Sequence, residues 1–177
     1  NNVADVGKML AAFNKDKNVI RVKNNFAKPN DLGYSDINMN IRLPNGTIAE
    51  IQLNTTANLV AKERYGHSLY EVHRSLKDKE GYKDLVGIME DAQRALYGLS
   101  NRDSRRGTYK PSEAVSEAIR NGDTGAIFKE EHKEYADVIK PFVKRAIPMF
   151  KRAEESGDID PKVAGHFRDL VKRLKNT

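Results

Sequence analysis

A carboxylate, an amide and two cations occur in the first third of this chain of 177 residues. Glu50 is followed two residues later by Gln52, while Arg21 and Lys23 stand two residues apart in an earlier run. Cations can neutralise phosphate groups, a carboxylate can act as a base or metal ligand, and amides can orient a substrate. The combination predicts a site for a nucleotide phosphate. The alternative is a face of the protein that is simply solvated.

These residues lie in segments whose alternation of apolar and polar side chains is typical of β-strands. The predicted strands cover residues 19–23, 37–42 and 47–54, and we expect Ile20 and Val22 to face the core. A three-residue loop at 44–46 is favoured between the last two strands, because Gly46 suits the left-handed position that such a loop requires.

This loop fixes the register of the hairpin. It pairs residue 40 with 50 and residue 38 with 52, whereas a two-residue turn would set an apolar side chain opposite a carboxylate. The favoured register gives one polar face with four side chains, namely Asn38, Asn40, Glu50 and Gln52. The sequence therefore predicts a polar platform centred on Glu50.

The remaining segments have the periodicity of amphipathic helices, so the predicted fold class is α+β. Helices are expected at 3–13, 55–76, 82–99, 112–120 and 131–155, with a last one after Asp160-Pro161, where Asp caps and Pro takes the first position. Pro141 and Pro148 should start, kink or break the helix that contains them. Residues 100–113 are polar, basic and rich in turn formers, which predicts a linker or loop.

Composition narrows the function classes. The net charge of +6 favours polyanionic partners such as nucleotides or nucleic acid. The absence of cysteine excludes disulfides and thiolate metal sites. No apolar run approaches the roughly 20 residues of a membrane span, and the first residues do not resemble a signal peptide. The basic residues of the 100–113 segment could hold a phosphate or an RNA backbone, although a solvated loop is the simpler interpretation.

Four motifs, in order, resemble the synthetase domain of RelA/SpoT-type alarmone synthetases. That family has R-x-K-D, then Pro, then G-Y-x-S-x-H, and E-x-Q-x-R-T after a hairpin. The corresponding residues here are Arg21-Val22-Lys23, Pro29, Gly33-Tyr34 and Glu50-Ile51-Gln52-Leu53-Asn54-Thr55. The spacing from the first motif to Tyr34 matches without a gap, and His67 stands on the next helix, as a His does in the family. The resemblance covers roughly residues 3–76.

The resemblance implies a nucleotidyltransferase-like fold, a small mixed or antiparallel sheet covered by helices. It divides the chain into a synthetase-like domain at 1–99, the basic segment at 100–113 and a helical extension at 114–177. The family carries a metal-binding Asp on a strand upstream of its first helix. That position precedes Asn1, so we expect the 1–99 domain to lack its first strand.

The resemblance also implies a reaction and a role for each matching residue. The reaction moves pyrophosphate from ATP to a ribose hydroxyl, with Mg²⁺ as cofactor. Glu50 would activate the acceptor hydroxyl and contribute to metal binding, and Tyr34 would stack on the acceptor base. Arg21 and Lys23 would bind the phosphates. The acceptor pocket would be lined by Asn38, Gln52 and His67.

Because this sequence departs from the family pattern at several positions, the resemblance does not determine which nucleotide is the acceptor. The departures fall at acceptor-contacting positions. Asn24 replaces the family's Asp, and Asn54 replaces its Arg. Ser35 replaces its Gln, Asp36 its Ser and Asn38 its His. The expected products are an alarmone or, for a toxin, a pyrophosphorylated adenosine nucleotide or tRNA 3′ end. Such a toxin would act in the cytoplasm, could be delivered within a larger secreted or phage protein, and would have an antitoxin or immunity protein as partner. The alternative is an inactive module that binds nucleotide, RNA or protein.

Overall fold

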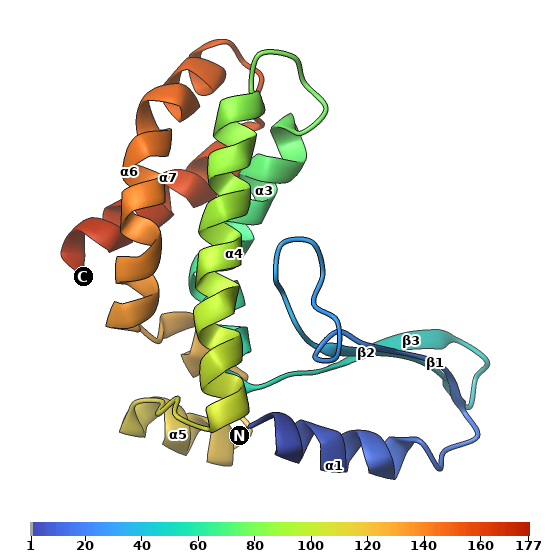
Figure 1. The fold of residues 1–177 in the computed structure, drawn as a ribbon. Helices are drawn as coiled ribbons and strands as arrows, with labels where there is room; N and C mark the ends of the chain where they lie inside the picture. Colours follow the sequence, from blue (N-terminus) through green and yellow to red (C-terminus); the bar gives the residue numbers. More distant parts are fainter. Residues whose placement is uncertain (1) are drawn as a thin grey trace.

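A small sheet stands beside a bundle of helices in the computed structural model, which describes residues 2–177 except the side chains of Thr124 and Phe128 (Figure 1). Strands β1 (Val19–Asn24), β2 (Ile37–Arg42) and β3 (Ile48–Leu53) form an antiparallel sheet in the order β1-β2-β3. The helices are α1 (Val3–Phe13), α2 (Thr56–Ala61), α3 (His67–Leu76), α4 (Lys83–Arg106), α5 (Glu113–Arg120), α6 (Lys133–Glu155) and α7 (Pro161–Asn176), with a π-helical turn η1 (Lys62–Gly66) and a 3-10 turn η2 (Thr124–Lys129). The predicted α+β class is confirmed.

The hairpin between β2 and β3 has the predicted register. The Leu43 amide donates to the Thr47 carbonyl at 2.8 Å, and Gly46 closes the loop with a φ of 83°. Asn40 therefore lies opposite Glu50. The neighbouring strand β1 continues the same rows, because its residues 21 and 23 pair with residues 40 and 38. The resulting polar face carries Arg21, Lys23, Asn38, Asn40, Glu50 and Gln52.

Helix α1 covers the opposite, apolar face of the sheet (Figure 1). The buried side chains there are Val6, Phe26, Ile37, Met39 and Leu53. The expectation that Ile20 faces the core was wrong, since Ile20 is 51% exposed. Val22 pairs with the buried Met39 and so lies on the apolar side as expected, although it remains 37% exposed. The pairing shifts between Val19 and Arg21, so Ile20 is the extra residue of a bulge, and β1 is an edge strand with less cover.

Helix α4 is longer than predicted, and the loop expected from residue 100 is helical as far as Arg106. Gly107 ends the helix in the left-handed region with a φ of 65°. The polar side chains of the last turns are buried because they have partners on neighbouring elements. The Tyr135 hydroxyl donates to Asp103 at 3.0 Å, and the Thr55 and Ser104 hydroxyls lie 2.6 Å apart. The division of the chain into domains around this segment stays a prediction.

Helices α2 to α7 share one core, with α4 packed against α2, α3 and α6. The cap at Asp160 is confirmed, since its side chain accepts from the Lys162 amide at 2.8 Å. Helix α6 is not broken by its prolines and continues through Pro141 and Pro148. Thr55 caps α2, and the helix expected at 55–76 is interrupted by the π-helical turn η1. Within residues 2–177, no helix is both long and apolar enough to cross a lipid bilayer.

Two buried asparagines tie the loop between β1 and β2 to the helices. Asn58 on α2 donates through Nδ2 to the Ser35 carbonyl at 3.1 Å and to Asn101 Oδ1 at 2.9 Å. Asn101 on α4 donates in turn to the Gly33 carbonyl at 2.8 Å. This amide relay (Asn58 and Asn101) fixes the backbone on both sides of Tyr34.

We expect Asn58→Leu to lower the free energy of unfolding by about 2–3 kcal/mol, because it leaves the Ser35 carbonyl and the Asn101 side chain buried without their donor. Urea denaturation measures the change. Asn176→Leu, at an exposed position on α7, is the control and should change stability by less than about 0.5 kcal/mol. Equal stability of the two variants would contradict a structural role for the relay.

Candidate functional site

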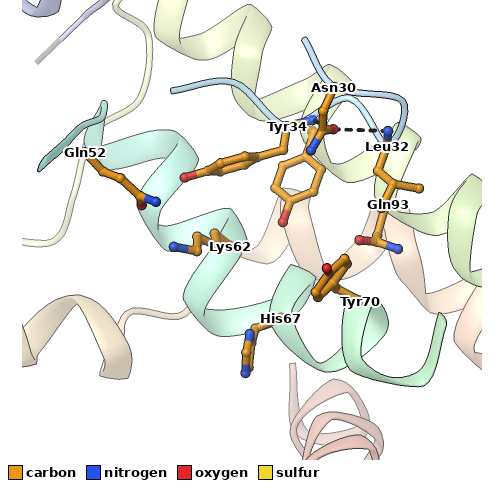
Figure 2. A pocket seen from close by; sticks show the side chains of 9 residues that line it. Asn30, Leu32, Tyr34, Gln52, Lys62, His67, Tyr70 and Gln93 are labelled. Atoms are coloured by element: carbon orange, nitrogen blue, oxygen red, sulfur yellow. Dashed lines mark hydrogen bonds between the residues drawn. The ribbon is translucent and has the colours of Figure 1, made fainter. Parts of the chain in front are cut away.

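A cavity of about 330 Å³ opens beside the polar face of the sheet. Figure 2 shows its lining side chains converging from the loop after β1, from β3, from the η1–α3 segment and from α4. The lining residues are Asn30, Leu32, Tyr34, Gln52, Lys62, His67, Tyr70, Gln93 and Tyr97. We call this space the aromatic cavity, because three tyrosines contribute to its wall.

Local hydrogen bonds shape the loop that carries Tyr34. The Asn30 side chain accepts from the Leu32 amide at 3.1 Å and from the Tyr34 amide at 2.9 Å (Figure 2). Gly33 has a φ of 88°, which a side chain would disfavour. Its carbonyl is held by Asn101. The sequence Asn30-Asp31-Leu32-Gly33 therefore forms a rigid turn that presents Tyr34 to the cavity.

Tyr34 is held in one orientation by three contacts. Asn54 Nδ2 donates to its hydroxyl at 2.6 Å, the Tyr97 ring meets it edge-on at 5.2 Å, and Lys62 Nζ lies 5.7 Å from its ring centre. Burial, together with the charge of Asp36, raises the pKa of the Tyr34 phenol. The Tyr34 phenol therefore stays neutral near pH 7.

The floor of the aromatic cavity comes from α4. Tyr97 is only 4% exposed, and burial raises the pKa of its phenol. Gln93 is buried beside it and donates through Nε2 to the Met89 carbonyl at 3.1 Å. Its side-chain oxygen has no hydrogen bond among the described residues. That oxygen is thus available to accept a bond from a ligand.

Gln52 joins the aromatic cavity to the polar face of the sheet. It lines the cavity, and its Nε2 donates to Glu50 Oε1 at 3.0 Å. Among the residues predicted for the site, Tyr34, Gln52 and His67 thus lie in the cavity. The other four predicted residues lie on the adjoining strands, namely Arg21, Lys23, Asn38 and Glu50. The site therefore consists of two adjoining parts.

Sequence reasoning missed several lining residues, namely Asn30, Lys62, Tyr70, Gln93 and Tyr97. Tyr70 follows His67 by three residues and so shares its face of α3. Gln93 and Tyr97 stand four apart beside the predicted buried stripe of α4. That spacing places them on one face, but it could not indicate that the loop after β1 packs on this face.

The polar face fits a metal ion only in part. In the described part of the chain, no three His, Asp or Glu side chains are grouped so that they could hold a metal. Glu50 is the single carboxylate among the strand residues of the polar face. Mg²⁺ is commonly held by one or two carboxylates together with substrate phosphates and water. The face therefore fits Mg²⁺ that arrives with phosphates rather than a resident ion.

Comparison with known proteins does not identify a family. No family model, no curated protein and no solved structure matches the chain.

Gly66 lets η1 approach the cavity floor, since a Cβ there would lie 2.1 Å from Tyr97 Oη and 2.8 Å from Cζ. We expect Gly66→Ala to lower the free energy of unfolding by about 1–3 kcal/mol through overpacking. Adding Tyr97→Phe removes the closer atom and should restore part of the loss, measured by urea denaturation.

Gly87→Ala is the matched control, because nothing lies within 4 Å of a Cβ at that position on α4. It should be neutral or stabilising by up to about 1 kcal/mol, as expected for alanine in a helix. A Gly66→Ala protein as stable as Gly87→Ala would rule out the close approach.

Proposed function

We propose that the protein is a RelA/SpoT-like nucleotide pyrophosphokinase that transfers pyrophosphate from ATP to the ribose hydroxyl of an acceptor nucleotide. The observation that supports this best is the contact between Gln52 and Glu50, which joins an aromatic cavity to a face bearing a carboxylate and cations. A nucleoside needs a planar pocket, its phosphates need cations, and the reacting hydroxyl needs a base between them.

In the proposed complex, the acceptor base packs against Tyr34 and its polar edge meets Gln93 or His67. Gln52 and Asn38 orient the ribose. Neutral tyrosine rings suit this role because every base offers a planar face for stacking. These contacts do not discriminate between guanosine and adenosine, so the acceptor nucleotide or tRNA 3′ end is identified by assay.

In the proposed reaction, the acceptor hydroxyl oxygen attacks the β-phosphorus of ATP. The bond from that phosphorus to the bridging oxygen of the α-phosphate breaks, AMP leaves, and the hydroxyl proton passes to Glu50. Arg21 and Lys23 neutralise the phosphates. Mg²⁺ bound with ATP would add positive charge beside Glu50. Positioning and charge neutralisation account for most of the acceleration in such transfers.

As a toxin, the protein would act in the cytoplasm and be neutralised by an antitoxin or immunity protein. As an alarmone synthetase, it would take a guanosine nucleotide as acceptor. The net charge of +6 suits polyanionic substrates in either case.

Glu50→Gln should lower pyrophosphate transfer by at least about 100-fold, because an amide cannot accept the hydroxyl proton. The assay follows label from γ-labelled ATP with Mg²⁺ into GDP, GTP, ADP, AMP or tRNA. It uses residues 1–177 and a chain extended upstream of Asn1, since the resemblance places a metal-binding Asp there.

Glu117→Gln is the matched control, because that carboxylate is exposed on α5 and should leave transfer unchanged. Nucleotide binding without transfer by either chain would favour the inactive binding module. Transfer that survives Glu50→Gln would refute the proposed base.

Tyr34→Ala should weaken binding of the acceptor nucleotide by about 5- to 150-fold, the equivalent of roughly 1–3 kcal/mol of stacking. Tyr34→Phe keeps the ring, loses only the bond from Asn54, and should bind within about fivefold of the wild type. Isothermal titration calorimetry of both variants gives the two constants. Equal losses would show that the ring does not stack on the ligand.

A further inference from the structure

A second, strongly basic cavity lies on the other side of the loop that carries Tyr34. Its volume is about 480 Å³, and four of its lining residues are arginines. The lining residues are Pro29, Gly33, Arg94, Gly98, Asn101, Arg102, Arg105 and Arg106. No acidic side chain is among them. We call this space the arginine groove.

The arginines form a row along one face of α4. Residues 94, 98, 101, 102 and 105 recur at the spacing that places side chains on a single face of a helix. The eleven residue steps from Arg94 to Arg105 correspond to about 16 Å at 1.5 Å per residue. The 29–33 loop forms the opposite wall. The basic surface is therefore elongated.

Among the described residues, two of the four arginines of the arginine groove have carboxylate partners, and two do not. Arg94 is oriented by Glu90 at 3.0 Å and Asp91 at 3.2 Å. Arg102 pairs with Asp103 at 3.4 Å and with Glu134 at 3.8 Å. Within residues 2–177, neither Arg105 nor Arg106 has an ion pair. Basic residues in a last helical turn interact favourably with the helix dipole. That accounts for Arg105 and Arg106, but not for the alignment of Arg94 and Arg102 with them.

We propose that the arginine groove binds the phosphate backbone of single-stranded nucleic acid. Arginine forks recognise phosphate oxygens in pairs, and a basic groove beside aromatic rings is the usual design of single-strand binding sites. A row of about 16 Å exceeds what a single phosphate occupies, so it suits successive phosphates of a strand. The inference does not depend on the proposed transfer reaction, because it concerns binding alone.

The two cavities share one wall. Pro29 and Gly33 line the arginine groove, whereas Asn30, Leu32 and Tyr34 line the aromatic cavity. Gly33 packs against α4, where a Cβ would lie 3.6 Å from the Arg94 Cα. Only this loop therefore separates a nucleic-acid strand in the arginine groove from the tyrosine rings of the aromatic cavity.

The test measures fluorescence anisotropy of labelled RNA and DNA strands of about 12 nucleotides, a length in the usual range of single-strand sites. The groove variant carries Arg102→Gln, Arg105→Gln and Arg106→Gln. The control variant carries Lys144→Gln, Arg145→Gln and Lys151→Gln, which remove the same charge from exposed positions of α6 outside the groove. Thermal unfolding verifies that both variants are folded.

We expect the groove variant to bind at least about tenfold more weakly than the control variant. A plot of the logarithm of the binding constant against the logarithm of the salt concentration should have a slope shallower by about 2 for this variant. Each phosphate contact on a single strand contributes about 0.7 to that slope, and the variant lacks three arginines. Loss of binding to either strand type supports the proposal. Equal losses in the two variants would show that net charge alone matters. No binding by the wild type, or equally tight binding of a dinucleotide, would overturn the proposal.

Discussion

The amide relay of Asn58 and Asn101 is the constraint on which both cavities depend. It connects two backbone carbonyls of one loop to side chains of two different helices, at distances of 2.8–3.1 Å. Each bond contributes about 1 kcal/mol net, but leaving a buried partner unpaired costs more than making the bond gains. The loop therefore has little freedom to move without breaking the whole relay. The hydroxyl pair of Thr55 and Ser104 repeats the connection between the start of α2 and α4 a turn further on.

Because the amide relay holds this short loop in place, one side of the loop can line an aromatic cavity while the other lines a basic groove. Its Tyr34 side faces rings and amides, and its Gly33 side faces guanidinium groups. Helix α4 supplies both floors, because Tyr97 and Arg94 stand three residues apart and point to either side of the loop. A positive φ at Gly33 allows the chain to pass close to α4 between them. A Cβ there would meet Tyr97 and Arg94 at 3.5 and 3.6 Å, an ordinary contact distance, so the positive φ is what favours glycine at this position.

The sequence predicts the sheet better than it predicts the cavities. Gly46 and the alternation around it determine the register of the hairpin, because both are local and a shift of one residue would expose the apolar face. The bulge at Ile20 could not be predicted, since an alternating run does not show where a strand gains a residue. The sequence predicts a loop at the last turns of α4, because their polar residues resemble a solvated segment. Ser104 and Asp103 are buried only because Thr55 and Tyr135 meet them from distant parts of the chain.

The resemblance predicts seven residues of the candidate site as one set. It could not predict which of them lie on the polar face of the sheet and which line the aromatic cavity. That division depends on where α2 and η1 turn after β3. Thr55 caps α2 immediately after the strand, and the π-helical turn then places Lys62 and His67 beside Gln52. A regular helix through 62–66 would change the direction of every later side chain by part of a turn. Local periodicity does not reveal such an insertion.

The polar face keeps its positive and negative side chains on different strands. The cations Arg21 and Lys23 lie on β1, the carboxylate of Glu50 lies on β3, and the amides of β2 stand between them. Adjacent strands are about 4.8 Å apart, so roughly 10 Å separates the outer rows. Cations next to Glu50 would pair with it and neutralise both partners. Among the described residues, Glu50 accepts instead from a neutral amide, Gln52. Within residues 2–177, the carboxylate on β3 and the cations on β1 are thus not paired with one another across the polar face.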